Sequence, residues 1–145
     1  MSTVLTRTVA RFLLLPILMV AIATVIKGYS QTGDGFSGGV IAATAILLQY
    51  LAFGRRAVRH VLPPAVAPVA VLFGLSLALL VAFVPMLLGA PVLTHAPPPG
   101  QAVVTLGSLA LHTAVLFDAA IFCLVFGFVT GVLDRFGAAA EEHPE

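Results

Sequence analysis

Four long apolar stretches, almost free of charged residues, constrain this chain more than any other feature. They run from about residues 9 to 26, 36 to 53, 65 to 88 and 104 to 133. A helix needs about 20 predominantly apolar residues to cross the hydrocarbon core of a bilayer. Every backbone polar group must be satisfied internally there, which favours helices. The sequence therefore predicts an all-α integral membrane protein with four transmembrane helices, in a single membrane domain that covers residues 1–145.

The composition excludes several other classes of protein. Charged residues make up 9% of the 145 residues, whereas a soluble domain has roughly 25%. The formal net charge of +1 leaves no basic surface for a nucleic-acid backbone. One cysteine and four dispersed histidines show no disulfide or metal-ligand spacing. We therefore expect no enzyme active site, no metal, no cofactor and no nucleic-acid partner, and we expect the lipid bilayer to surround the chain.

The distribution of basic residues predicts the orientation of the spans. In a four-span topology one side of the membrane holds only Lys27, and the other holds the remaining six basic residues: Arg7, Arg11, Arg55, Arg56, Arg59 and Arg135. Basic residues in short flanks favour the cytoplasmic side. Both termini are therefore predicted to be cytoplasmic. The chain ends in a polar tail, residues 134–145, and its part after Arg135 is predicted to be disordered.

The first apolar stretch has a second interpretation. Arg7 and Arg11 precede an apolar run that reaches Ala21-Ile22-Ala23. A basic start, an apolar core and a small-x-small site are also typical of a cleaved signal peptide. The charge bias does not distinguish the two interpretations, because cleavage would leave the other spans oriented as before. The mass of the mature protein would distinguish them.

A glycine-rich segment, residues 33–38, precedes the second span and matches the pattern G-x-G-x-x-G. A dinucleotide site needs a strand before this pattern, but here a membrane helix precedes it. A structural role fits better, because Gly38, Ala42, Ala45 and Gln49 lie on one helix face. Small residues favour close helix contact, and Gln49 can hydrogen-bond across it. Contact within this subunit and contact with a partner both remain open.

Asp118 is the most informative single residue. It lies near the middle of the predicted fourth span, where an ionised carboxylate costs about 2.5–3.5 kcal/mol on insertion scales. Such an acid must face protein or water, or be protonated. A proton or ion path and a structural hydrogen bond between helices are the two interpretations.

His112 and Lys27 are the other candidates for an ion pathway. His112 lies six residues before Asp118, which turns it about 120° around the helix, so the two do not share a face. It therefore suits interhelical packing or, second, a proton relay. Lys27 ends the first span, where its ammonium can reach the interface or contribute to an ion path.

Two segments together resemble a known family. Residues 28–40 are similar to the glycine-rich signature of the B-type subunits of the Mrp (Mnh) multisubunit sodium/proton antiporters, and residues 112–118 are similar to the last-helix motif of the same family. The family's phenylalanine and acid are kept as Phe36 and Asp118. Tyr29 stands where the family usually has histidine, which removes the basis for a proton role at that position.

The resemblance implies an accessory subunit of a complex in a prokaryotic cell membrane. It implies other antiporter subunits as partners, Na⁺ and H⁺ as transported ions, and exchange driven by the proton motive force. We also predict that residues 33–39 form an assembly element. The candidate residues for assembly are Gly33, Gly35, Phe36, Gly38 and Gly39, together with Gln49 of the second span. The alternatives are a membrane subunit of a related ion-pumping hydrogenase-type complex and a purely structural helical scaffold.

Overall fold

The computed structural model describes residues 3–27, 33–96, 104–106, 109–111 and 113–142. Within these residues the chain forms five helices and two short strands. In chain order they are α1 (Val4–Lys27), α2 (Asp34–Phe53), α3 (Arg55–Val61), α4 (Val66–Leu87), β1 (Val104–Leu106), β2 (Leu109–Leu111) and α5 (Thr113–Glu142). Helices α1, α2, α4 and α5 are each long and apolar enough to cross a membrane. The prediction of a helical membrane protein with four spans is confirmed.

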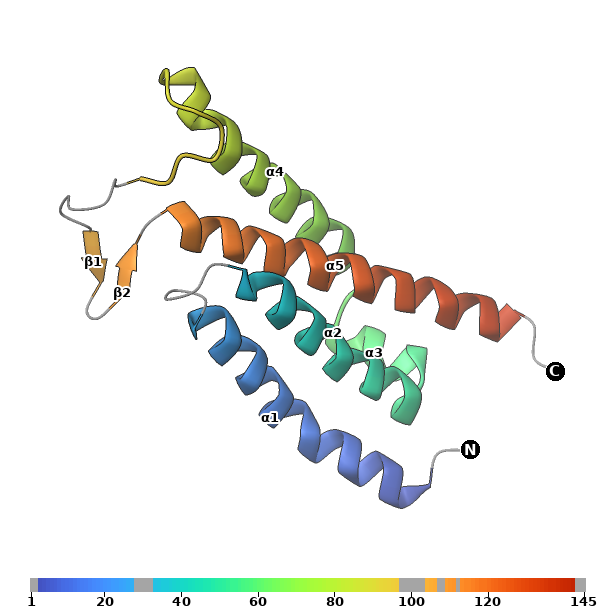
Figure 1. Cartoon of the computed structure of the whole chain (residues 1–145). Helices are drawn as coiled ribbons and strands as arrows, with labels where there is room; N and C mark the ends of the chain where they lie inside the picture. The colour runs from blue at the N-terminus through green and yellow to red at the C-terminus, as the bar shows by residue number, and fades with distance from the viewer. Residues whose placement is uncertain (1–2, 28–32, 97–103, 107–108, 112, 143–145) are drawn as a thin grey trace.

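The four long helices form a single layer rather than a closed bundle. The extensive contacts join α1 to α2, α2 to α5, and α5 to α4, whereas α1 contacts α5 only slightly. Figure 1 shows this order, with α4 and α1 at the two edges of the layer and both termini at the same end. The layer therefore has two broad faces, and each edge helix packs along one side only.

Small residues allow α4 and α5 to pack closely. A Cβ atom on Gly74 of α4 would lie 2.5 Å from the carbonyl oxygen of Ala120. A Cβ atom on Gly127 of α5 would lie 2.7 Å from the carbonyl oxygen of Ala67. Membrane helices associate through such packing, because lipid gives no hydrophobic drive between them. The α4–α5 contact depends on these two positions remaining free of side chains.

The fourth span begins later than predicted. Residues 104–106 and 109–111 form an antiparallel pair in which Val104 faces Leu111, and α5 begins only at Thr113. The predicted start near Val104 was wrong because hydropathy does not separate an apolar strand from a buried helix. The sequence did contain a hairpin signal, since Gly107-Ser108 separates the two apolar runs. The hairpin lies at the end of the layer opposite the termini (Figure 1).

The polar tail is helical over most of its length. Helix α5 continues through the predicted tail to Glu142, so the prediction of disorder after Arg135 is wrong for residues 136–142. Three consecutive alanines, residues 138–140, favour the helix. Glu141 also forms an ion pair with Arg55 of α3, at 3.1 Å. Local propensity and this contact together extend α5 beyond the apolar segment.

Candidate functional site

Asp118 lies near one end of its helix rather than at its middle. Because α5 begins at Thr113, Asp118 falls in the second turn, close to the start of α2. The prediction that Asp118 lies near the middle of the fourth span is therefore wrong, and the error follows from the late start of α5. Asp118 is 5% exposed, so its carboxylate is enclosed by protein.

The Asp118 carboxylate accepts a hydrogen bond from the residue that precedes α2. The backbone N–H of Gly33 donates to Asp118 Oδ1 at 3.2 Å and to Oδ2 at 3.3 Å. Gly33 has a φ of 118°, in the region that favours glycine, and it has no side chain to cap the helix itself. A carboxylate near a helix N-terminus also complements the helix dipole. Asp118 of α5 therefore supplies the cap that α2 lacks.

Gly35 brings α2 and α5 into direct backbone contact at the same point. A Cβ atom on Gly35 would overlap the backbone carbonyl oxygen of Asp118. No flexible side chain is available to move out of the way there. Any larger residue at position 35 must therefore push the two helices apart and disturb the cap on Gly33.

Gly38 and Gly39 extend this junction to three helices. Gly38 packs on Val25 and on the carbonyl oxygen of Ala21 in α1. Gly39 packs on Val125 and on the carbonyl oxygen of Phe122 in α5. The glycine-rich segment therefore joins α2 to both of its neighbours within this subunit.

Gln49 forms the hydrogen bond that its helix face predicted. Its Nε2 donates to the carbonyl oxygen of Ala10 in α1 at 2.7 Å. Ala42 and Ala45 on the same face are buried. The stripe from Gly38 to Gln49 is therefore used for packing within the subunit, which was one of the two interpretations left open.

The other predicted residues have different surroundings. Phe36 is 58% exposed, and it lies beside the buried glycines at the start of α2. Lys27 is exposed at the end of α1, at the same end of the layer as Asp118 (Figure 1). His112 and Tyr29 lie outside the described residues.

A second cluster, at the other end of α5, was missed. Asp134 accepts hydrogen bonds from Arg59 Nε and Nη2 at 2.8 and 2.6 Å, and from Arg55 Nε at 3.2 Å. The hydroxyl of Tyr50 also donates to Asp134, at 3.3 Å. Hydrogen bonding to Asp134 raises the pKa of Arg55 and of Arg59. The cluster ties α3 and the end of α2 to α5.

The sequence carried a signal for this second cluster. Arg55 and Arg59 are four residues apart, and Asp134 and Glu141 are seven apart, so each pair shares one helix face. The arginines were instead used only to predict the topology, and the acids were placed in the polar tail. Among the residues that the structure describes, no group of three or more His, Cys, Asp or Glu side chains could hold a metal ion.

The fold and its junctions define a class: a small multi-pass membrane protein, built as an open helical layer whose ends are held by two aspartates of one helix. Residues 5–131 match the family described as "Domain related to MnhB subunit of Na+/H+ antiporter". The chain belongs to this family.

Two relatives support the assignment. The chain is 32% identical over 132 residues to the B-type subunit of the Na(+)/H(+) antiporter of Alkalihalophilus pseudofirmus, covering 91% of this chain and 90% of that protein. It is 34% identical over 121 residues to the Bacillus subtilis protein of the same name, covering 83% of each.

The solved structure is the Mrp complex from a Dietzia species. The alignment has a TM-score of 0.72 at 23% identity and covers 92% of this chain. This chain spans only 14% of the length of the matched chain. The structural likeness therefore establishes the fold, and the family assignment rests on the sequence relatives.

Proposed function

We propose that this chain is the B-type subunit of a multisubunit Na⁺/H⁺ antiporter, with other antiporter subunits as its partners. The observation that carries the proposal is the family match over residues 5–131. Relatives named as this kind of subunit are 32–34% identical over most of their length. The chain would act in transport, and we propose no catalysed chemical reaction for it.

The open layer supports a role inside a larger membrane assembly. In α1 only Ala10 and Ala21 are buried, although the helix has 24 residues. Large apolar side chains such as Phe73 and Leu80 are likewise exposed on α4. Neighbouring helices or lipid must cover these faces, because the layer does not cover them itself. An accessory subunit packed against larger neighbours would present faces of this kind.

The test of the proposed function is complementation of a host that lacks this subunit. A tagged copy of the chain should co-purify with the other antiporter subunits from the native membrane. Membrane vesicles should show Na⁺/H⁺ exchange when the chain is present and lose it when the chain alone is deleted. Normal exchange without the chain, or co-purification with redox subunits instead, would overturn the proposal.

We also propose that the end of the layer that carries both termini faces the cytoplasm. The described basic residues at this end outnumber those at the Lys27 end by six to one. Ala57→Cys in exposed α3 and Val92→Cys in the exposed 88–96 segment report the two sides. In a Cys123→Ser background, an impermeant thiol reagent added from outside should label the cysteine at position 92 only. Outside labelling at position 57 would reverse the orientation.

Asp118 is proposed as the residue of this subunit that an ion path would use. Its carboxylate is buried, and its described hydrogen-bond donor is one backbone N–H group. A proton or a sodium ion that reaches the carboxylate would compete with this bond. Binding and release of the ion at Asp118 would therefore be coupled to the hydrogen bond at the start of α2. Lys27 and His112 are proposed as secondary candidates.

A further inference from the structure

We propose that a groove between α4 and α5 holds an anionic phospholipid, with its phosphate at Arg135 and an acyl chain along the helices. The groove has a volume of about 570 Å³, within the range of roughly 300–1,000 Å³ that is typical of ligand sites. We call this site the α4–α5 groove, and its lining includes Leu72 of α4 and Gly127, Phe128, Gly131 and Arg135 of α5. The inference requires only that the chain spans a membrane.

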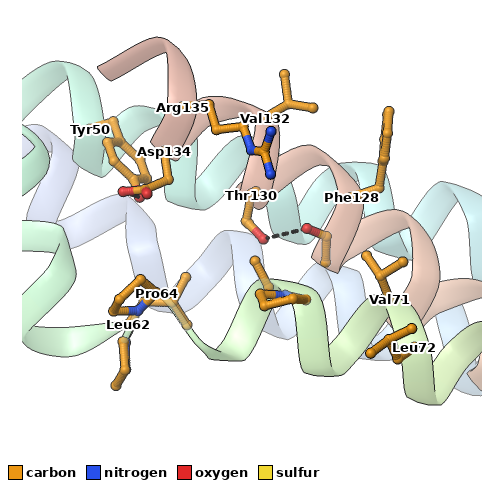
Figure 2. Close-up of a pocket in the computed structure, with 15 residues that line it drawn as sticks. Tyr50, Leu62, Pro64, Val71, Leu72, Phe128, Thr130, Val132, Asp134 and Arg135 are labelled. Atoms are coloured by element: carbon orange, nitrogen blue, oxygen red, sulfur yellow. Dashed lines mark hydrogen bonds between the residues drawn. The ribbon is translucent and has the colours of Figure 1, made fainter. Parts of the chain in front are cut away.

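The α4–α5 groove is polar at one end and apolar along the rest of its length. Tyr50, Asp134 and Arg135 line the end near the chain termini, and Val71, Leu72 and Phe128 line the deeper part (Figure 2). Phe128 precedes Arg135 by seven residues, which is about 10 Å along a helix. This length takes the groove from headgroup level into the hydrocarbon region. The distribution of polar and apolar lining residues therefore matches a phospholipid and not a small soluble ligand.

The one polar group in the deeper part is already satisfied. The hydroxyl of Thr130 donates to the carbonyl oxygen of Phe126 at 2.7 Å and lies 3.2 Å from that of Gly127. Figure 2 shows the second of these contacts as a dashed line. Since Thr130 is 1% exposed, it offers no donor to a ligand. An apolar chain can lie beside it without leaving a polar group unpaired.

Charge at the mouth of the groove favours an anionic headgroup. Asp134 is held by Arg55 and Arg59, so its negative charge is already matched by two positive charges. Arg135 is exposed and forms no ion pair within the described part of the chain. A guanidinium group binds phosphate through paired hydrogen bonds, and juxtamembrane arginines attract anionic lipid. Arg135 is therefore the residue that selects the headgroup.

The test is native mass spectrometry of the chain in its purified complex, after exchange into detergent with phosphatidylglycerol or phosphatidylcholine. The wild type should retain more phosphatidylglycerol than phosphatidylcholine. Arg135→Gln should lower that retention about tenfold, as expected for loss of a charged hydrogen-bond donor. Arg56→Gln, which removes an exposed arginine that does not line the groove, should leave it unchanged. Free glycerol phosphate should not displace phosphatidylglycerol from the groove.

A second pair of variants tests the acyl-chain part of the groove. Gly131→Leu places a side chain inside it and should lower retention of both lipids. Gly131→Ala is the matched control, because its Cβ would make only an ordinary contact, 3.4 Å from Ala67 Cβ. Equal retention of phosphatidylglycerol by the wild type and Arg135→Gln would overturn the proposal. A partner subunit's carboxylate bound to Arg135 in the assembled complex would also overturn it.

Discussion

Asp118 and Asp134 lie on the same helix, sixteen residues or about 24 Å apart, and each joins α5 to the α2–α3 part of the chain. Asp118 is buried and accepts from the backbone N–H of Gly33. Asp134 is partly exposed and is bound by two arginines and a tyrosine. Two carboxylates with the same structural task therefore have opposite electrostatic surroundings.

This difference indicates which end of the subunit is more sensitive to substitution. At the Asp134 end several donors share one acceptor, and water can replace any that is lost. At the Asp118 end one backbone group meets one enclosed carboxylate, and the glycines leave no space for adjustment. Since an unsatisfied buried group costs more than an exposed one, changes at the Asp118 end should have the larger effects.

The largest effect on the fold is expected for Gly35→Ala. Its Cβ would overlap the carbonyl oxygen of Asp118, which is backbone and cannot rotate away. We expect a loss of stability at the upper end of the usual overpacking range, about 3 kcal/mol. The thermal midpoint of the purified complex and the amount of this subunit in it measure the loss. Gly131→Ala, which meets only an ordinary contact, is the matched control.

A wild-type thermal midpoint for Gly35→Ala would contradict the proposed rigidity of the Asp118 end. A fall that equals that of Gly131→Ala would contradict it as well, because it would show a general cost of replacing glycine. Tighter packing at the Asp118 end would then not explain the contrast with the Asp134 end.

The largest effect on transport is expected for Asp118→Asn. The amide keeps an oxygen that can accept from Gly33 N–H, so assembly should be near normal. If Asp118 belongs to an ion path, Na⁺/H⁺ exchange in vesicles should fall at least tenfold, because the amide does not titrate. Asp118→Glu keeps the acid and should retain part of the exchange.

A purely structural role for Asp118 gives the opposite order. Asn would then be tolerated, and the longer Glu would disturb the buried junction. Quantifying the assembled complex beside the exchange rate separates the two cases. Exchange by Asp118→Asn at the wild-type rate, in fully assembled complex, would exclude the ion-path proposal.

The four spans were predictable from the sequence because their apolar content is a property of each segment alone. The hydrogen bond of Gln49 was also predictable, since helical spacing places it on the small-residue face. The position of Asp118 near the start of its helix was not, because hydropathy merged β1 and β2 with α5 and moved the apparent centre of the span. The spacing of Arg55 and Arg59 showed only that they share a helix face; their pairing with Asp134 depends on a contact between segments 75 residues apart, which no local pattern reports.

A smaller effect is expected for Asp134→Asn at the opposite end of α5. The change removes two ion pairs whose members are partly exposed, and such pairs contribute about 0.2–1 kcal/mol each. The thermal midpoint of the complex should fall by a few degrees, and high salt should narrow the difference from wild type. Arg56→Gln is the control for charge, because Arg56 is exposed and lies outside the cluster. A loss as large as that of Gly35→Ala would remove the contrast between the ends.

The smallest effect on this chain's own fold is expected for Phe36→Ala, and it tests whether the Asp118 end also contacts a partner. Phe36 is 58% exposed, so truncation leaves little cavity within the subunit. Phe73 of α4 is also 58% exposed and is therefore a matched control. If Phe36 packs on a neighbouring subunit, Phe36→Ala should reduce co-purification or exchange several-fold, while Phe73→Ala leaves both near wild type. Co-purification and exchange near wild type in both variants would mean that Phe36 faces only lipid, and the glycine-rich end would then serve packing inside the subunit alone.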